Sequence, residues 1–279
     1  MAIWKRQTSG HNGAFDPTYR FSTSWILPPG VLFFARALLS LYAFATLFYI
    51  FGWNGAHGRN IDSRRSFSFF TILTYWGLAF YFAFAAAHTG SYWLTGRPFL
   101  NRWFAPLRWA HSAFYSTITV YPFIVTAVFW ALLAPKNGFA STKDLWSNTS
   151  QHALNSFYAL FEIVIPRTEP LPFLHMIVIV FILALYLSLA YLTHALQGWY
   201  TYDFLNLDKH SSGVVAGYIV GILVGSLIIF LIVRYLILLR MWLTEKKLGK
   251  TGKFSNRDHR SMRDEEVGKH EEMHSMGVK

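Results

Sequence analysis

Six long apolar stretches run through this chain, and each is long enough to cross a membrane. A spanning helix needs about 20 mostly apolar residues. The stretches lie at 31–51, 67–89, 109–134, 146–165, 172–196 and 214–239. Only 14% of the 279 residues are charged, against about 25% in a soluble domain. The sequence therefore excludes a soluble globular fold and predicts an all-α, polytopic membrane helix bundle with about six transmembrane helices.

The chain divides into three parts by composition. Residues 1–30 form a polar N-terminal arm that ends in Pro28-Pro29-Gly30, and no cleavable signal peptide is expected in it. Residues 31–240 hold the predicted transmembrane domain. Residues 241–279 form a charged tail that is expected to be disordered. The chain has no cysteine, which excludes disulfides, thiolate catalysis and cysteine-based metal sites.

The formal net charge is +11, and in a soluble protein this would suggest a nucleic-acid partner. In a membrane protein, lysine and arginine mark the cytosolic loops instead. With six spans, the side that holds both termini carries about twice as many of them as the other side. We therefore expect cytosolic termini, no nucleic-acid partner, and a location in the endoplasmic reticulum, other endomembranes or the plasma membrane.

Ionisable residues inside a membrane are costly and start as functional candidates. Glu162 lies within the fourth stretch, which is also polar in its first half. Its carboxyl group could belong to a functional site, or it could pair with a polar group on a neighbouring helix. The sequence leaves both roles open. The histidines fall into two groups by predicted side: His88, His111 and His175 at the cytosolic face, His152 and His194 at the opposite face.

Thr71 lies in the first turns of the second stretch, near the same membrane boundary as His152. A hydroxyl and an imidazole at one depth could form a nucleophile–base pair, since a neutral hydroxyl is a poor nucleophile without a base. The alternative is that such a hydroxyl bonds a carbonyl one turn back in its own helix. Thr74, one turn further along, is an alternative nucleophile.

The order of several short motifs resembles a known family. They are Phe69-Phe70-Thr71-Ile72-Leu73 in the second stretch, Tyr121-Pro122-Phe123 in the third, Trp146-Ser147-Asn148 with His152 and Glu162 in the fourth, and His194, Gly198 and Tyr202-Asp203-Phe204-Leu205 after it. In this order and spacing the chain resembles the androgen-induced and androgen-dependent membrane proteins, which are multi-span threonine hydrolases.

Members of that family cleave fatty acid esters of hydroxy fatty acids. The resemblance implies that Thr71 is the nucleophile and His152 its base, with Asn148, Glu162 and His194 in supporting roles near the substrate. It further implies that membrane lipids and a fatty acyl ester are the partners. No cofactor and no metal are expected.

Two other functions remain open. A non-enzymatic membrane protein for lipid binding, scaffolding or transport would use Thr71 and His152 only for packing. A b-type haem protein would use His88, His111 and His175 on the cytosolic side as axial ligands, because haem iron needs histidines on facing helices. The same three histidines could also hold a metal ion, although their spacing matches no known signature.

Overall fold

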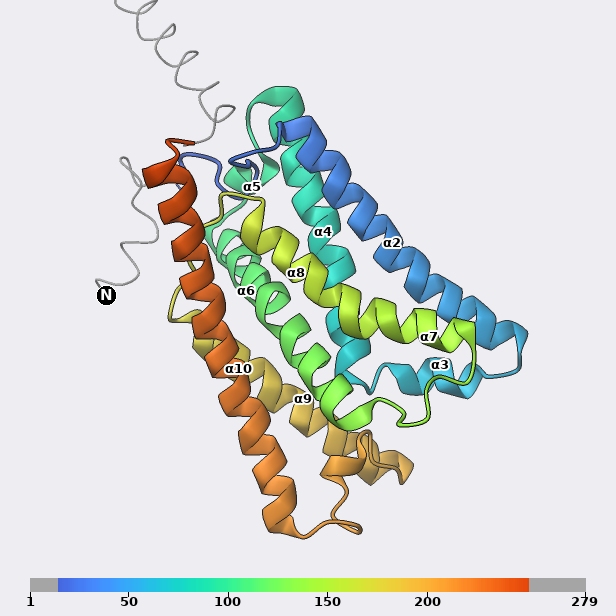
Figure 1. Ribbon diagram of the computed structural model, residues 1–279. Coiled ribbons are helices and arrows are strands. Elements are labelled where there is room, and N and C mark those ends of the chain that lie inside the picture. Colours follow the sequence, from blue (N-terminus) through green and yellow to red (C-terminus); the bar gives the residue numbers. More distant parts are fainter. Residues whose placement is uncertain (1–14, 251–279) are drawn as a thin grey trace, which may run out of the picture.

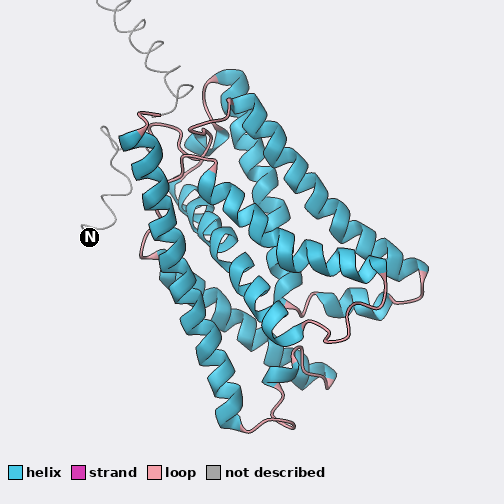
Figure 2. Cartoon of the chain, viewed as in Figure 1, coloured by secondary structure: helices cyan, strands magenta, loops and turns pink. Residues whose placement is uncertain are grey.

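The computed structural model describes residues 15–250, and all of its regular structure is helical (Figure 2). Within these residues the only β-type pairing is an isolated bridge between Ser24 and Pro166. The predicted all-α membrane helix bundle is confirmed. The predicted tail from residue 251 onward lies outside the described residues, as do residues 1–14.

In the described part of the chain, five helices are long and apolar enough to cross a membrane: α2 (Pro29–Ala56), α4 (Phe70–Thr95), α6 (Ala105–Val128) with its π-helical extension Phe129–Leu133, α9 (His175–Gln197), and α10 (Ser212–Met241) with its π-helical extension Trp242–Lys247. Short helices α3 (Asn60–Ser66) and α5 (Phe99–Arg102) lie in the loops, as does a 3-10 turn at Asp203–Leu205. The last helix continues past residue 240, where the charged tail was predicted to begin.

The fourth predicted span forms a helix but is not among these five. It consists of α7 (Thr142–Thr149), a π-helical segment (Ser150–Leu154) and α8 (Asn155–Val164), which together run across the bundle (Figure 1). Its inward face is polar, and its outward face is apolar: Leu154, Phe157, Leu160 and Val164. A low mean hydropathy follows from this division, because polar side chains can cross a bundle only where neighbouring helices supply hydrogen bonds.

Proline and glycine set several helix ends. Pro29 is the first residue of α2, where a missing N–H costs nothing. Gly96 and Gly198 end α4 and α9 in the left-handed conformation, with φ of 77° and 73°. Pro122 lies inside α6, and its carbonyl accepts hydrogen bonds from Asn155 and Ser156 at 3.3 Å each. These bonds tie α6 to α8.

The N-terminal arm packs into the bundle. Ser22, Thr23 and Ser24 are buried. Ser24 donates its hydroxyl to the Ile165 carbonyl at 2.7 Å, and the Thr23 carbonyl accepts the Arg167 N–H at 3.0 Å. Both ends of the described chain therefore lie at one end of the bundle, which we call the arm end (Figure 1).

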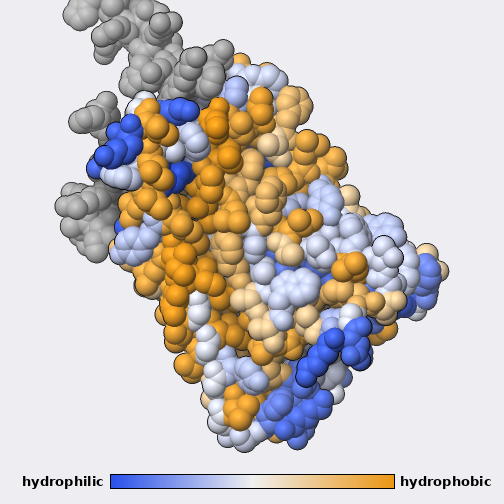
Figure 3. Space-filling model, viewed as in Figure 1, coloured by the Kyte–Doolittle hydropathy of each residue, from blue (hydrophilic) through white to orange (hydrophobic). Residues whose placement is uncertain are grey.

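The surface matches a membrane environment. Hydrophobic side chains cover the length of α10, and hydrophilic ones gather toward the ends of the molecule (Figure 3). Exposed large apolar residues recur along α9 and α10, including Ile177, Phe181, Val220 and Ile228. Soluble monomers rarely expose large contiguous apolar patches. In a membrane this surface faces lipid.

Candidate functional site

An apolar cavity of about 200 Å³ lies between the start of α4, the end of α6, α9 and α10. Carbon atoms of large side chains form nearly all of its wall, and Thr71 is among the lining residues. We call it the Thr71 cavity. An apolar pocket with few polar groups suits a lipid or another hydrophobic ligand.

Thr71 is buried and is the second residue of α4. Within residues 15–250 its hydroxyl makes no bond to a helix carbonyl, unlike that of Thr74. Tyr202, from the loop after α9, lines the same cavity. The Tyr202 hydroxyl accepts the Phe70 N–H at 3.1 Å and also interacts with the Thr71 side chain. Thr71 and Tyr202 thus form a polar pair in the wall of this cavity, which Tyr186 also lines.

Thr74 faces a different space. It lines a second cavity of about 510 Å³ between α4, α6 and α9, which we call the Thr74 cavity. The Thr74 hydroxyl donates to the carbonyls of Phe70 and Thr71 at 2.9 and 3.0 Å. A hydroxyl that donates to carbonyls of its own helix has its proton already bound within that helix. This geometry favours Thr71 over Thr74 as a nucleophile.

His152 lies in the π-helical segment Ser150–Leu154 and is buried. Its ring stacks face to face on Phe129, with centroids 3.6 Å apart and an interplanar angle of 6°. Phe129 itself begins the π-helical segment that extends α6. Two π-helical segments therefore meet at this stack. Such segments within α-helices are frequent at functional sites.

Phe129 belongs to the surroundings of both Thr71 and His152, the two residues that the family resemblance implies are catalytic. Its ring lines the Thr71 cavity and stacks on His152. In the described chain Thr71 and His152 share no hydrogen bond, and His152 Nδ1 is buried without a partner. Phe129 thus contacts His152 and also forms part of the wall of the cavity that Thr71 lines. Catalytic hydrogen bonds are often long or unformed in the free enzyme.

The supporting residues Asn148 and His194 line neither cavity. Asn148 donates its amide to the Asp144 carbonyl one turn back at 2.8 Å. The half-buried His194 ring stacks on Tyr200 at 3.7 Å, and its Nδ1 has no partner within residues 15–250. Neither side chain is therefore near enough to line the space beside Thr71.

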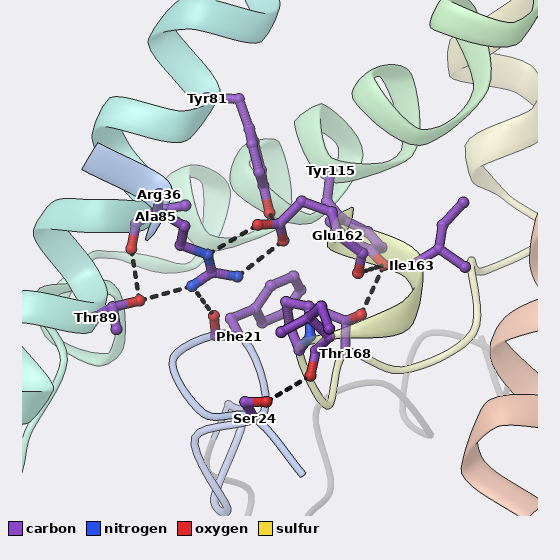
Figure 4. A network of polar contacts seen from close by, with 12 residues as sticks. Phe21, Ser24, Arg36, Tyr81, Ala85, Thr89, Tyr115, Glu162, Ile163 and Thr168 are labelled. Atoms are coloured by element: carbon purple, nitrogen blue, oxygen red, sulfur yellow. Dashed lines mark hydrogen bonds and ion pairs between the residues drawn. The ribbon is translucent and has the colours of Figure 1, made fainter. Parts of the chain in front are cut away.

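Glu162 lies far from this cavity, in a polar network at the arm end (Figure 4). Its two carboxylate oxygens each accept a hydrogen bond of 2.8 Å from the guanidinium of Arg36. Both side chains are 0% exposed. Tyr81 donates to the same carboxylate at 3.3 Å. Tyr81 lies ten residues after Thr71 in α4, or about 15 Å along the axis.

The guanidinium of Arg36 makes further hydrogen bonds within this network. Its Nη1 donates to the Phe21 carbonyl at 2.8 Å and to the Thr89 hydroxyl at 2.6 Å. A bidentate buried pair with further hydrogen bonds has the geometry that such a pair requires. Of the two roles left open for Glu162, the structural one fits these contacts.

The three arm-end histidines do not converge on one point. The rings of His88 and His111 meet edge to face, 4.9 Å apart, which leaves no gap for a haem between them. His175 instead shares a hydrogen bond of 2.7 Å with Ser116, and neither of these two residues lines the Thr71 cavity or the Thr74 cavity. Among the described residues no cluster of three or more His, Cys, Asp or Glu is arranged to hold a metal ion.

The sequence interpretation missed two residues of the Thr71 region. Tyr202 was part of a motif but had no role, and Phe129 was assigned no role. The available signal for Tyr202 was its place just after the glycine that ends the fifth span. A tyrosine in such a loop has many possible neighbours, so its contact with Thr71 depends on how the loop folds back.

Comparison of the chain with family models, with curated proteins and with solved structures gives no match. The likeness to the threonine hydrolases therefore stays a prediction that rests on the ordered motifs alone. The chain itself is an all-α membrane helix bundle with a threonine and a tyrosine at an apolar cavity.

Proposed function

We propose that this protein is an integral membrane lipid hydrolase that cleaves the internal ester of a fatty acid ester of a hydroxy fatty acid. Thr71 is the nucleophile, and His152 is the general base. The observation that carries the proposal is the setting of Thr71. Its hydroxyl is free of helix carbonyls and lies beside Tyr202 in an otherwise apolar cavity.

The position of Thr71 in α4 supports catalysis electrostatically. Phe69 provides no side-chain cap for the helix, and the Tyr202 hydroxyl takes that place by accepting the Phe70 N–H and interacting with the Thr71 N–H. The helix dipole also places partial positive charge at this end. An ester carbonyl beside Thr71 develops negative charge on its oxygen as the hydroxyl attacks. Tyr202 and the start of α4 would stabilise that charge.

The reaction proceeds in two steps. The Thr71 oxygen attacks the ester carbonyl, its proton passes to the His152 imidazole, and the alcohol leaves with that proton. The acyl group is then esterified to Thr71. Water attacks this acyl-enzyme with His152 as base, the fatty acid leaves and Thr71 regains its proton. For this His152 must move off the Phe129 ring on which it stacks.

We further propose that both termini are cytosolic and that the protein lies in the endoplasmic reticulum, another endomembrane or the plasma membrane. The lysine and arginine bias of the loops supports this orientation. Thr71 would then lie near the non-cytosolic boundary, because α4 begins at the end opposite the arm. A site near a boundary gives water access to the acyl-enzyme.

One observation favours a second candidate, a lipid-binding membrane protein without catalysis. It is the stack of His152 on Phe129, which keeps the imidazole from the Thr71 hydroxyl in the described structure. In that case the cavity binds an acyl chain and Thr71 is only part of its wall. The two candidates differ in covalent reactivity.

Covalent labelling separates them. Membranes that contain the wild-type protein are treated with a fluorophosphonate probe and compared with those of Thr71→Ala, Thr74→Ala and His152→Ala. All four must reach equal expression. We expect labelling in the wild type and in Thr74→Ala, and its loss in the other two. Thr74→Ala is the matched control because it removes a threonine one turn away.

Loss of labelling only in Thr74→Ala would move the nucleophile to the second cavity. An unlabelled wild type that is folded and retains bound lipid would support the non-enzymatic candidate. Hydrolysis of a palmitic acid ester of hydroxystearic acid by the same membranes then tests the substrate class.

A further inference from the structure

The Thr74 cavity is elongated along the bundle axis. Its wall runs from Trp109 to Pro122 on α6 and from Val178 to Leu189 on α9. At 1.5 Å per residue these stretches measure about 20 and 16 Å. Its volume of about 510 Å³ falls within the range of roughly 300–1,000 Å³ typical of ligand pockets. A long, narrow space of this kind fits a chain better than a compact molecule.

The walls offer hydrocarbon and few free polar groups. The hydroxyls of Thr74 and Thr117 donate to carbonyls of their own helices, and that of Tyr121 donates to the Ile179 carbonyl at 2.9 Å. The Tyr186 hydroxyl donates to the Ser68 carbonyl. The indole N–H of Trp109 is buried without a partner, and it lies at the far end of the cavity, where α6 begins. The occupant is therefore apolar over most of its length.

The cavity has a route to the membrane. Leu185 lines it and is 53% exposed on the outer face of α9, and Ala110 lines it and is exposed on α6. In a membrane bundle such a face meets lipid acyl chains. Hydrocarbon can therefore enter between α6 and α9 without passing through water.

An aromatic partition separates the two cavities. Phe70 and Tyr186 line both, and their ring centroids are 4.9 Å apart. Phe70 is adjacent in sequence to Thr71 at the start of α4. A carbonyl carbon beside Thr71 therefore lies close to the partition, from which one chain can extend into each cavity.

We propose that the Thr74 cavity is a second acyl-chain site, which holds one arm of a two-chain ester while the other arm lies in the Thr71 cavity. This inference rests on the proposed function, because it assigns the two cavities to the two arms of that substrate. It makes Gly77 a specificity-determining position. Gly77 lines the Thr74 cavity, and a β-carbon there would lie 3.6 Å from Phe114, an ordinary contact.

The test introduces larger side chains that fill the Thr74 cavity. Gly77→Leu adds four carbons inside it, and Ala110→Leu adds three, so a second variant is at hand if the first does not fold. Gly221→Leu is the matched control, because a side chain at Gly221 meets nothing within 4 Å and lines neither cavity. Each purified protein is assayed with a palmitic acid ester of hydroxystearic acid and with 4-nitrophenyl hexanoate, which has one short chain.

We expect Gly77→Leu and Ala110→Leu to lower kcat/KM for the two-chain ester by about tenfold or more, because a pocket that loses room for methylenes discriminates by roughly 10–200-fold. Hydrolysis of 4-nitrophenyl hexanoate should change less than about twofold, and Gly221→Leu should match the wild type for both esters. An equal loss for both esters would overturn the assignment of the two arms.

A binding readout keeps this inference separate from catalysis. A diazirine-bearing palmitate is photo-crosslinked to the Thr71→Ala protein with and without Gly77→Leu, and the labelled peptides are mapped. We expect label on the α4, α6 and α9 segments of the Thr74 cavity, reduced by Gly77→Leu and unchanged by Gly221→Leu. If the wild type hydrolyses neither ester but this label is found, the proposed function fails and the hydrocarbon site stands. Absence of label on these segments would contradict an acyl-chain site in the Thr74 cavity.

Discussion

Two polar regions lie toward opposite ends of α4 and differ in how their hydrogen bonds are used. At the arm end Arg36, Glu162 and Thr89 are buried, and the guanidinium and carboxylate bond to one another and to their neighbours. At the start of α4, about 27 Å away by helix rise, Thr71 and His152 are also buried. There the Thr71 hydroxyl has no carbonyl partner and His152 Nδ1 has no partner at all within residues 15–250.

This difference distinguishes a structural from a functional use of polar groups in a membrane bundle. A buried charge is tolerated only when its bonds are satisfied by facing helices, and the Arg36–Glu162 pair meets that condition. A group that takes part in a reaction must keep bonding capacity for the substrate. On this criterion Glu162 belongs to the scaffold, and Thr71 remains the candidate for chemistry.

The largest effect on stability is expected at the Arg36–Glu162 pair. Glu162→Ala leaves the Arg36 guanidinium buried without its carboxylate, which costs about 3–5 kcal/mol of stability. We expect poor yield and a strongly lowered Tm of the protein purified in detergent. The double variant Arg36→Met with Glu162→Leu removes both charges and should recover most of the loss. A double variant as unstable as Glu162→Ala would show that charge pairing is not what the site contributes.

A smaller effect on stability but a large one on rate is expected at the Thr71 cavity. Tyr202→Phe removes the hydroxyl that accepts the Phe70 N–H and faces Thr71. Loss of one oxyanion donor lowers kcat by about 10²–10³-fold, whereas loss of one neutral hydrogen bond costs only about 1 kcal/mol of stability. Hydrolysis rate and Tm measured on the same preparation test this. Unchanged kcat would remove Tyr202 from the reaction.

The smallest effect concerns the arm. Burial raises the pKa of the Asp16 carboxyl from 3.8 to about 6, although backbone N–H groups of Arg20 and Phe21 oppose this. Between these values the folded state holds a proton that the unfolded state has released. The stabilising contribution of protonated Asp16 is therefore lost as pH rises from about 4 through 6.

Asp16→Asn cannot ionise, so its Tm should fall less than that of the wild type between pH 4 and pH 7. Thermal unfolding in detergent at several pH values measures the difference between the two proteins. Parallel Tm curves would mean that Asp16 does not titrate differently in the folded state.

The sequence alone determined where the helices run. Each predicted stretch became a helix, because a run of about 20 apolar residues in lipid must satisfy its backbone within itself. Pro29, Gly96 and Gly198 mark helix ends through local backbone conformation. The weakness of the fourth stretch was also visible, and its helix is the one that fails as an apolar span.

Only the tertiary structure decided which polar groups meet. Arg36 and Glu162 are 126 residues apart, and their pairing depends on how two helices rotate and pack. The same holds for Phe129 against His152, for Tyr202 against Thr71, and for the separate cavities behind Thr71 and Thr74. Helical periodicity is a local property of the chain. The neighbour that a side chain faces is set by the packing of the whole bundle, which no single segment encodes.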